Sequence, residues 1–331
     1  MKTRIIWAMM MAGLLLACEK KMTDMGNVYE EPEVSLEIVM APEQTKASDE
    51  GDEGESAVVD YQVLIYDASS RMLETYAVAS SGNVEVKCTR GQKEILVLAN
   101  APDVSTALSY DDLLKAKSYL KDNSRGSFVM EGTKSLDLTS ESGTVVIDVR
   151  RIVSKVVLTD VTVDFENDRY DELDFILKRV YLTNVPGFRT YLEHKGEIDL
   201  WYNQDRVDEN LDEGLKSLLY QQIADFNMKN DRSYETRHQF YTYPNPYDSE
   251  VSGSGWAPRP TRLVVEAQLG EELYYYPVTL PELKQNVRYH VSLHVARPGA
   301  LSPDENMEKQ AAVFTVNVVD WQGTEVVTES I

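Results

Sequence analysis

The chain of 331 residues contains 33 basic and 55 acidic residues, which gives a formal net charge of −22. Such a surface repels phosphate backbones and anionic headgroups, so this composition excludes nucleic acid as the expected partner. With 43% hydrophobic residues the chain can bury a sizeable core, and its length suggests about two domains.

The first residues predict an export signal. Lys2 and Arg4 precede the apolar run Ile5–Leu16, which is too short to span a bilayer as a helix of roughly 20 residues. The run ends in Leu15-Leu16-Ala17-Cys18, which is similar to bacterial lipobox sequences. That resemblance implies that Cys18 is diacylated and becomes the first residue of the exported chain. An ordinary secretory signal with an incidental cysteine is the alternative interpretation.

The chain has only two cysteines, Cys18 and Cys88. If Cys18 carries lipid, Cys88 has no intramolecular partner, and the exported protein must be stabilised by its core instead of a disulfide. Loss of Lys2 and Arg4 with the signal makes the chain still more acidic. Membrane contact is therefore expected through the lipid, which holds a protein to a bilayer without a spanning helix.

The segment that follows predicts one strand. Apolar and other residues alternate over 34–40, with Val34, Leu36, Ile38 and Met40 on one face. This period of two is typical of a half-buried strand.

An acidic stretch, Ala41–Ala57, follows and has too few apolar residues to pack. We expect a mobile loop there. Calcium binding is a weaker alternative, because the spacing of its carboxylates fails the EF-hand pattern. Lys46, followed by Ala47, is the only Lys or Arg between Lys21 and Arg71, so a trypsin-like protease would have one site in this loop. The alternative interpretation is that Lys46 is a solitary surface lysine.

The remaining chain is rich in β signals. We expect strands at Val58–Asp67, Met72–Ala79, Asn83–Cys88, Glu94–Ala99, Gly143–Val149, Arg151–Leu158, Phe175–Thr183, Gly196–Tyr202, Thr261–Leu269, Leu273–Leu280, Asn286–Ala296 and Ala312–Trp321. Two helices interrupt them: one capped by Ser109, and one over Asp208–Asn227, where leucines recur at helical spacing. This pattern predicts an all-β protein with minor helical insertions, made of two β-sandwiches that meet near residues 148–151.

The sequence contains no strong motif for catalysis or metal binding. The histidines form no zinc-spaced cluster, and His290 and His294, four residues apart on one strand, are roughly 13 Å apart. Ser252–Gly255 lacks the order of a nucleophile elbow and is predicted to be a loop. The run Tyr274-Tyr275-Tyr276 could stack on sugars, although neighbouring tyrosines of a strand face opposite sides and some must be core. We therefore expect no enzyme activity, no metal site and no cofactor.

Several segments together resemble the Bacteroidales fimbrillins, the shaft-type subunits of type V pili. They are Tyr61–Asp67, Gly91–Asn100, Phe128–Gly132, Arg151–Leu158, Phe240–Asn245 and Val318–Trp321. Their order, together with the lipobox and the acidic loop, carries the resemblance. It implies two tandem transthyretin-like β-sandwich domains, lipoprotein export to the outer membrane, proteolytic removal of an N-terminal segment, and assembly by strand exchange. Where the family commonly has an arginine at the processing site, this chain has Lys46.

The resemblance also places a donor strand at the end of the chain. Ten residues, Gln322–Ile331, remain after Trp321 and reach roughly 33 Å when extended. Val327 and Ile331 lie on one face of such a strand and Val326 on the other. The apolar pattern is thin, so a plain C-terminal tail is an open alternative, as is a contribution from the preceding strand, 312–321.

These expectations divide the chain into four parts: a signal peptide (1–17), a pro-segment with the removable strand (18–57), an N-terminal sandwich (58–149, completed by strand 34–40 before cleavage) and a C-terminal sandwich (150–331). The expected role is a structural subunit, carried to the outer membrane as a lipoprotein, cleaved after Lys46 and polymerised by strand exchange into a cell-surface fimbrium that mediates adhesion. Its partners would be other subunits, including tip and anchor proteins, and a processing protease. The alternative is a surface lipoprotein that acts as a tip adhesin or anchor and binds glycan or host protein.

Overall fold

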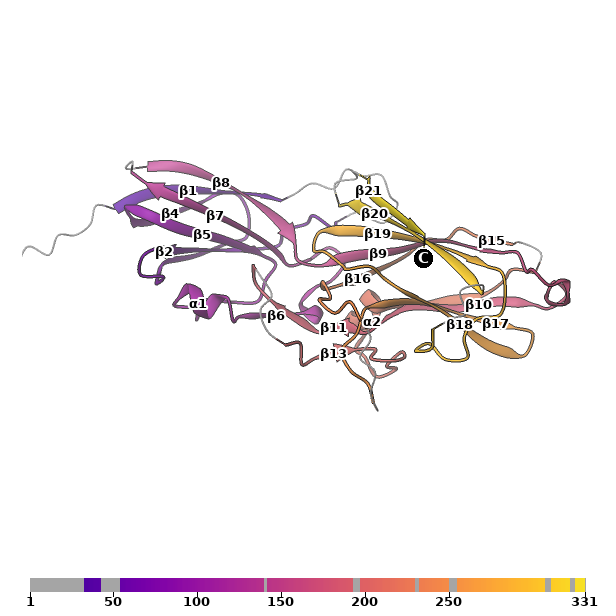
Figure 1. The fold of residues 1–331 in the computed structure, drawn as a ribbon. Helices are drawn as coiled ribbons and strands as arrows, with labels where there is room; N and C mark the ends of the chain where they lie inside the picture. Colours follow the sequence, from indigo (N-terminus) through magenta and orange to yellow (C-terminus); the bar gives the residue numbers. More distant parts are fainter. Residues whose placement is uncertain are drawn as a thin grey trace, which may run out of the picture. The chain divides into compact units, whose positions relative to one another are not determined.

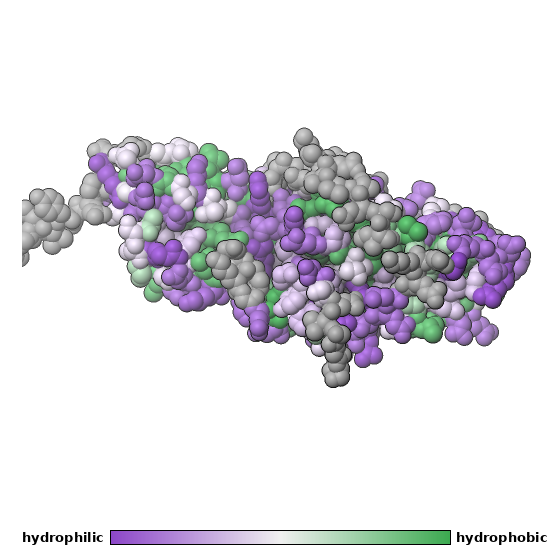
Figure 2. All heavy atoms as spheres, viewed as in Figure 1, coloured by the Kyte–Doolittle hydropathy of each residue, from purple (hydrophilic) through white to green (hydrophobic). Residues whose placement is uncertain are grey.

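A computed structural model describes residues 33–42, 54–139, 142–192, 197–229, 232–249, 255–306, 311–321 and 325–330 (Figure 1). Cys18, Lys46, Ala47 and Ile331 lie outside these ranges. No helix within them is long and apolar enough to cross a membrane. The face drawn in Figure 2 is mainly hydrophilic, with apolar residues in small groups between the polar ones.

The N-terminal half folds into a sandwich of one seven-stranded sheet with the order β3-β2-β5-β7-β8-β1-β4. Its strands are β1 (Glu33–Pro42), β2 (Tyr61–Asp67), β3 (Leu73–Ala79), β4 (Val84–Thr89), β5 (Gly91–Ala99), β7 (Met130–Leu138) and β8 (Ser142–Arg151). One layer is β3-β2-β5-β7 and the other is β8-β1-β4; among the described residues, strand pairing connects the layers at Met130↔Arg151 and Glu131↔Arg150 alone. The two layers enclose a core that both supply with alternating apolar residues.

The C-terminal half has two further sheets. The first has the order β15-β9-β19-β20-β21, with β16 also paired to β9, and the second has the order β14-β10-β17-β18. The strands of the first are β9 (Ser154–Val163), β15 (Ser233–Tyr234), β16 (His238–Thr242), β19 (Val287–Val295), β20 (Ala312–Asp320) and β21 (Glu325–Ser330). Those of the second are β10 (Phe175–Thr183), β14 (Tyr220–Asn227), β17 (Arg262–Leu269) and β18 (Glu272–Thr279). The apolar faces of both sheets meet in one core cluster.

Short elements complete the fold. They are β6 (Lys117–Tyr119), which pairs with β12 (Phe188–Thr190); β11 (Val185–Pro186), which pairs with β13 (Trp201–Tyr202); the helices α1 (Tyr110–Leu113) and α2 (Glu213–Leu219); and the 3-10 turns η1 (Leu120–Asp122) and η2 (Asp168–Tyr170). Ser109 caps α1, because its side chain accepts a hydrogen bond from the Asp112 N–H. The prediction of an all-β protein with minor helices is confirmed.

The predicted helix over 208–227 is largely wrong. Only Glu213–Leu219 is helical, capped by Asp212, and the chain then becomes strand β14. Strand β14 pairs with the edge of β10, with Tyr220 opposite Tyr181. The backbone hydrogen bonds offered by that edge outweigh the helical spacing of the leucines, and Ile223 is buried from a strand instead of a helix.

His238 on β16 is a buried neutral base that ties β14 to the sheet. Its Nδ1 lies 2.6 Å from Oε1 of Gln221, and its Nε2 lies 2.8 Å from the Tyr234 hydroxyl. Burial lowers the pKa of His238 to about 4. The neutral ring is therefore the form that this site holds.

This shift predicts an acid-sensitive fold. The unfolded chain binds a proton at His238 near the ordinary histidine pKa of 6.5, whereas the folded chain binds it only near pH 4, so stability falls as the pH drops through that window. We expect the free energy of unfolding to decrease by up to about 3 kcal/mol from this residue. Urea titrations between pH 7 and 4 test it, with His238→Gln as a control that cannot titrate. Equal pH dependence in both proteins would contradict the prediction.

Candidate assembly site: the slot of strand β1

Strand β1 lies inside a sheet, hydrogen-bonded on both sides. It runs antiparallel to β4, with Val34 opposite Cys88, and parallel to β8, with Met40 opposite Ile147. It comes first in the described chain, yet it separates two strands that come later (Figure 1). Without β1, strands β4 and β8 would each have an unpaired backbone edge.

One face of β1 fills the core of the N-terminal sandwich. Val34 and Ile38 are fully buried and Leu36 is 1% exposed, while Met40 packs against the same cluster from a partly buried position. Burying such a side chain is worth about 2 kcal/mol. The alternation in the sequence therefore corresponds to an alternation in burial, and the apolar face is the main noncovalent hold on the strand.

Polar contacts of β1 are exposed and contribute less. Glu33 pairs with Lys87 at 3.2 Å, and both side chains are more than half exposed. Glu37 accepts hydrogen bonds from Asn83 at 2.9 Å and from Thr144 at 3.1 Å. Exposed pairs of this kind are worth at most about 1 kcal/mol. The strand is held by its core face and its backbone.

Cys88 is a thiol that β1 helps to bury. It lies on β4, is 5% exposed and belongs to the same core cluster as Val34 and Leu36. Burial raises the pKa of the Cys88 thiol to about 11, so almost none of it is thiolate near neutral pH. We therefore expect the thiol to become more reactive if β1 leaves its place between β4 and β8.

The chain that leaves β1 is fixed again at Glu55, which is 1% exposed. Its carboxylate pairs with Nζ of Lys155 at 2.9 Å and also accepts hydrogen bonds from the Tyr241 hydroxyl and, at 3.1 Å, from Nε1 of Trp321. The Arg151 Nε donates to the Glu55 carbonyl oxygen at 2.9 Å. We call these five residues the Glu55 cluster.

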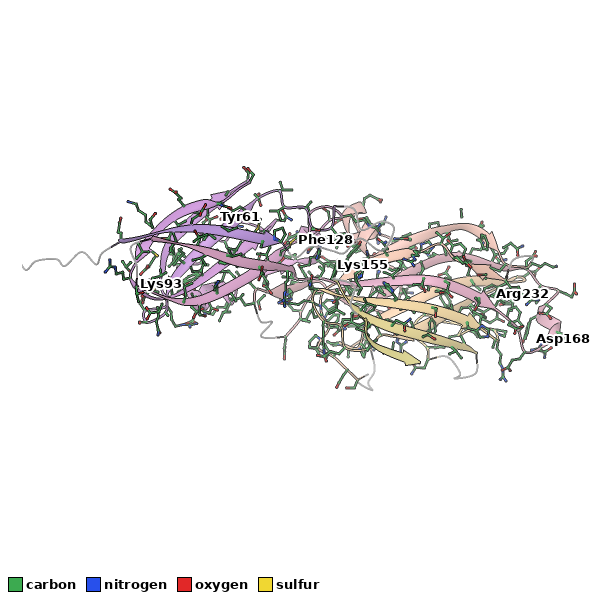
Figure 3. All side chains as sticks on the ribbon, turned by 90° about the horizontal axis from the view of Figure 1, so that it is seen from above. Tyr61, Lys93, Phe128, Lys155, Asp168 and Arg232 are labelled. Carbon is green, nitrogen blue, oxygen red and sulfur yellow. The ribbon has the colours of Figure 1, made fainter. Side chains whose placement is uncertain are left out.

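Aromatic rings close the Glu55 cluster on its sides. The Arg151 guanidinium lies 4.8 Å from the centre of the Trp321 ring, and the Phe128 ring packs against that of Tyr241 at 4.6 Å. Phe128 and Lys155 are both labelled in Figure 3. Trp321 stands at the end of β20, directly before the segment that leads to β21. The cluster therefore holds, in one buried place, Glu55, which follows the segment after β1, and Trp321, which precedes the segment before β21.

Sequence reasoning missed the Glu55 cluster. Its available signals were Lys155 within an otherwise apolar strand and a tryptophan that closes the last long strand. Neither shows a partner, because Glu55 and Lys155 are 100 residues apart in the chain.

The candidate donor residues lie on the outermost strand. Val326 and Val327 belong to β21, which among the described strands pairs with β20 alone, antiparallel, with Val318 opposite Val327. Strand β21 ends the order of its sheet, so one of its edges has no neighbouring strand in the described part of the chain. A strand held along one edge is easier to detach than one held along two.

The described residues offer little for catalysis. They contain no group of three or more His, Cys, Asp or Glu side chains that could hold a metal ion. On β19, His290 is half-buried and His294 is exposed, with its Nδ1 3.0 Å from the Thr162 hydroxyl. His194 and the loop residues Ser252–Ser254 lie outside the described ranges.

Comparison with known proteins found one matching family model and several solved structures of similar fold. Residues 33–156 match the family model described as major fimbrial subunit protein (FimA). No curated protein matches the chain. Among solved structures, a putative cell adhesion protein from Parabacteroides distasonis is similar with a TM-score of 0.64 at 15% identity, covering 88% of this chain and 99% of the other.

Two named fimbrial proteins have the same fold. A fimbrilin (FimA) from Porphyromonas gingivalis gives a TM-score of 0.62 at 15% identity over 89% of this chain and 99% of its own. The tip fimbrial protein Mfa3 from the same organism gives 0.53 at 14% identity over 88% of this chain and all of the other. Residues 33–156 therefore match the family model of the major fimbrial subunit protein FimA, and the chain as a whole has the fold of these solved cell adhesion and fimbrial proteins.

Proposed function

We propose that this protein is a structural subunit of a type V fimbrium that is assembled by strand exchange. The observation that carries the proposal is the position of β1, an inserted inner strand whose chain connection to the body passes through the segment that holds Lys46. Cleavage after Lys46 cuts that connection and leaves Ala47 as the new N-terminus. The role requires no catalysis by the protein itself.

Export as a lipoprotein precedes this step. Acylated Cys18 anchors the precursor to the outer membrane, and one cut after Lys46 then separates the body from lipid and β1 together. The intact β1 meanwhile covers the core and the two strand edges, which protects the precursor from pairing with other chains. The protein ends in a cell-surface fimbrium that mediates adhesion.

Loss of β1 creates a site that needs an occupant. Val34, Leu36 and Ile38 together bury apolar side chains worth about 6 kcal/mol, and this stabilisation is lost with the strand. A strand from another subunit restores it by β-augmentation. The C-terminal segment with Val326, Val327 and Ile331 is the candidate donor. Because donor and slot are different surfaces, the contact is head-to-tail and generates a filament instead of a closed dimer.

The decisive experiment compares the precursor with its Lys46→Ala variant. Trypsin should cut the wild type after Lys46 and start polymerisation, seen by electron microscopy and light scattering, whereas the variant should stay monomeric. Cys88 labelling with a maleimide should be slow in the precursor, fast after β1 leaves, and slow again in the polymer. Polymer from uncut Lys46→Ala protein, or cleaved protein that never assembles, would count against the proposal.

A matched control isolates the position of the cut. Lys216→Ala removes a lysine from α2, where it pairs with the exposed Glu213 and not with β1, and leaves Lys46 in place. This variant should be processed and polymerise like the wild type. Protein from native filaments should begin at Ala47; a chain blocked by acylated Cys18 would favour the anchor role.

A further inference from the structure

The sheet β14-β10-β17-β18 is covered on both faces. On the face toward the core, Val180, Val265 and Tyr276 belong to the main apolar cluster. The opposite face carries a row across three strands, because Arg179 on β10 is opposite Glu266 on β17, and Glu266 is opposite Tyr275 on β18. A sheet face of this polarity normally meets solvent, but here two loops enclose it.

One loop, Asn203–Asn210, is fixed to the sheet by its first residue. The Asn203 side chain donates to the Leu182 carbonyl at 2.8 Å and accepts from the Asp208 N–H at 2.9 Å. The backbone of Asn203 has a positive φ of 47°. At the other end Glu209 reaches Nη1 of Arg179 at 2.9 Å. These contacts make the loop a fixed wall.

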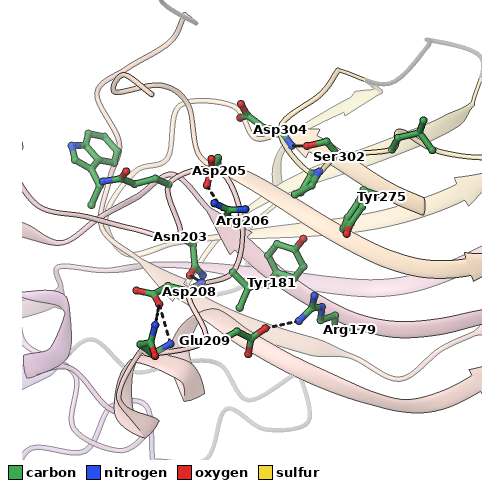
Figure 4. A pocket seen from close by; sticks show the side chains of 16 residues that line it. Arg179, Tyr181, Asn203, Asp205, Arg206, Asp208, Glu209, Tyr275, Ser302 and Asp304 are labelled. Carbon is green, nitrogen blue, oxygen red and sulfur yellow. Dashed lines mark hydrogen bonds and ion pairs between the residues drawn. The ribbon is translucent and has the colours of Figure 1, made fainter. Parts of the chain in front are cut away.

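The second loop is paired with Tyr275 itself. The backbone of Ala300 exchanges both hydrogen bonds with Tyr275, at 2.8 and 2.9 Å. Gly299 allows this approach, since a Cβ there would lie 2.3 Å from the Tyr275 carbonyl oxygen. Between the two walls lies an open cavity of about 900 Å³ (Figure 4). That volume is within the range of small-molecule sites.

Tyr181 presents to this cavity a polar atom that the described part of the protein does not use. Its residue is 1% exposed and lines the cavity, yet its hydroxyl has no hydrogen-bond partner among the described residues. The hydroxyl is therefore available to a molecule that enters the cavity. Burial raises the pKa of Tyr181 well above its usual value, so the hydroxyl keeps its proton as a donor. It lies beside the half-buried ring of Tyr275 in Figure 4.

The charged residues around the cavity indicate which class of ligand it would bind. Arg179 is neutralised by Glu266 at 2.7 Å and by Glu209, and Asp304 forms a double hydrogen bond with Arg259. The exposed Asp205 adds a weakly paired carboxylate, 3.7 Å from Arg206. Each arginine among the described lining residues lies within 4 Å of a carboxylate, so the lining has no arginine without an acidic neighbour to attract an anion. Fixed hydroxyls, carboxylates and two tyrosine rings suit a ligand that offers donors, acceptors and an apolar ring face together.

We propose that this cavity binds a neutral monosaccharide or disaccharide, with Tyr275 stacking on the sugar ring and the Tyr181 hydroxyl bonding one of its hydroxyls. The C-terminal half of the subunit would then recognise glycan along a surface separate from the β1 slot. This inference does not depend on strand exchange, because the uncleaved precursor already contains the cavity.

Binding is tested on the full-length precursor with the methyl glycosides of glucose, galactose, mannose, fucose and N-acetylglucosamine, each titrated against the fluorescence of Trp201, which lines the cavity. At least one should bind saturably. Tyr181→Phe should weaken that binding about tenfold and Tyr275→Ala at least as much. Tyr274→Phe, one residue away and packed against the core, is the matched control and should leave affinity unchanged.

Three results would overturn the inference: no saturable binding of any of these glycosides, tighter binding of sialyllactose or trilysine than of every neutral sugar, or equal weakening by Tyr274→Phe. A Gly299→Ala variant, which displaces the wall at Ala300, should lose binding while it remains folded by circular dichroism. Polymerisation after trypsin is measured in parallel on Tyr181→Phe, so failure of glycan binding and failure of assembly are seen separately.

Discussion

A Lys155→Met subunit is expected to lose about 3 to 5 kcal/mol of unfolding free energy. The substitution leaves the Glu55 carboxylate, whose side chain is 2% exposed, without its cation in the interior. Tyr241 and Trp321 still donate hydrogen bonds to it, but they do not neutralise its charge. Guanidinium chloride titration followed by tryptophan fluorescence measures the loss, because Trp321 belongs to the same cluster.

The double variant Glu55→Gln with Lys155→Met provides the control. It removes both charges and keeps an oxygen for the Trp321 N–H, so at least half of the lost stability should return. Lys216→Met, which breaks an exposed pair with Glu213 on α2, should cost less than about 1 kcal/mol. A single Lys155→Met variant as stable as the wild type would show that the Glu55 cluster does not hold the two segments.

Leu36→Ala in the precursor is expected to cost about 3 kcal/mol. Leu36 is 1% exposed at the centre of β1, and its truncation leaves a cavity against β8 and β4. The hold on β1 weakens by the same amount. After trypsin cleavage the strand should therefore leave faster, and Cys88 labelling and polymer growth should both accelerate.

Val39→Ala is the matched control for Leu36→Ala. Val39 lies on the opposite face of β1, is only partly buried and does not belong to the core cluster. Its truncation should change stability by less than about 1 kcal/mol and leave the labelling rate of Cys88 unchanged. If both variants behave alike, the apolar face of β1 is not what retains the strand.

The sequence was informative where structure depends on local alternation. The pattern of Val34, Leu36 and Ile38 has a period of two, and a strand with that period buries one face wherever it pairs. The alternation gives neither the place of β1 between β4 and β8 nor its parallel alignment with β8. Those depend on the edges that distant segments offer, and they are visible only in the fold.

Helical spacing misled where a sheet edge was available. The run from Leu211 to Phe226 reads as one amphipathic helix, but the chain leaves the helix after Leu219 and pairs with β10. Strand β7 was not predicted from its own residues, because Gly132–Ser135 is polar and weakly β-prone; pairing with β5 fixes it instead. The tyrosine run illustrates the same limit, since only the folded sheet shows that Tyr275 faces the cavity and Tyr276 the core.

Because β1 is an inserted strand, cleavage of its chain connection would act by lowering the local concentration of β1 at its own site. Strand β1 ends at Pro42, and the chain is fixed again at Glu55. While the two remain connected, the effective concentration of β1 at its site between β4 and β8 is in the millimolar range typical of a short connection. Cutting the tether breaks no contact of β1 with β4 or β8. It lowers the competing strand to its concentration in the surrounding medium, and a thousandfold dilution is equivalent to about 4 kcal/mol. In the proposed assembly, a protease would thus shift the balance toward a donor strand without changing the contacts of the fold.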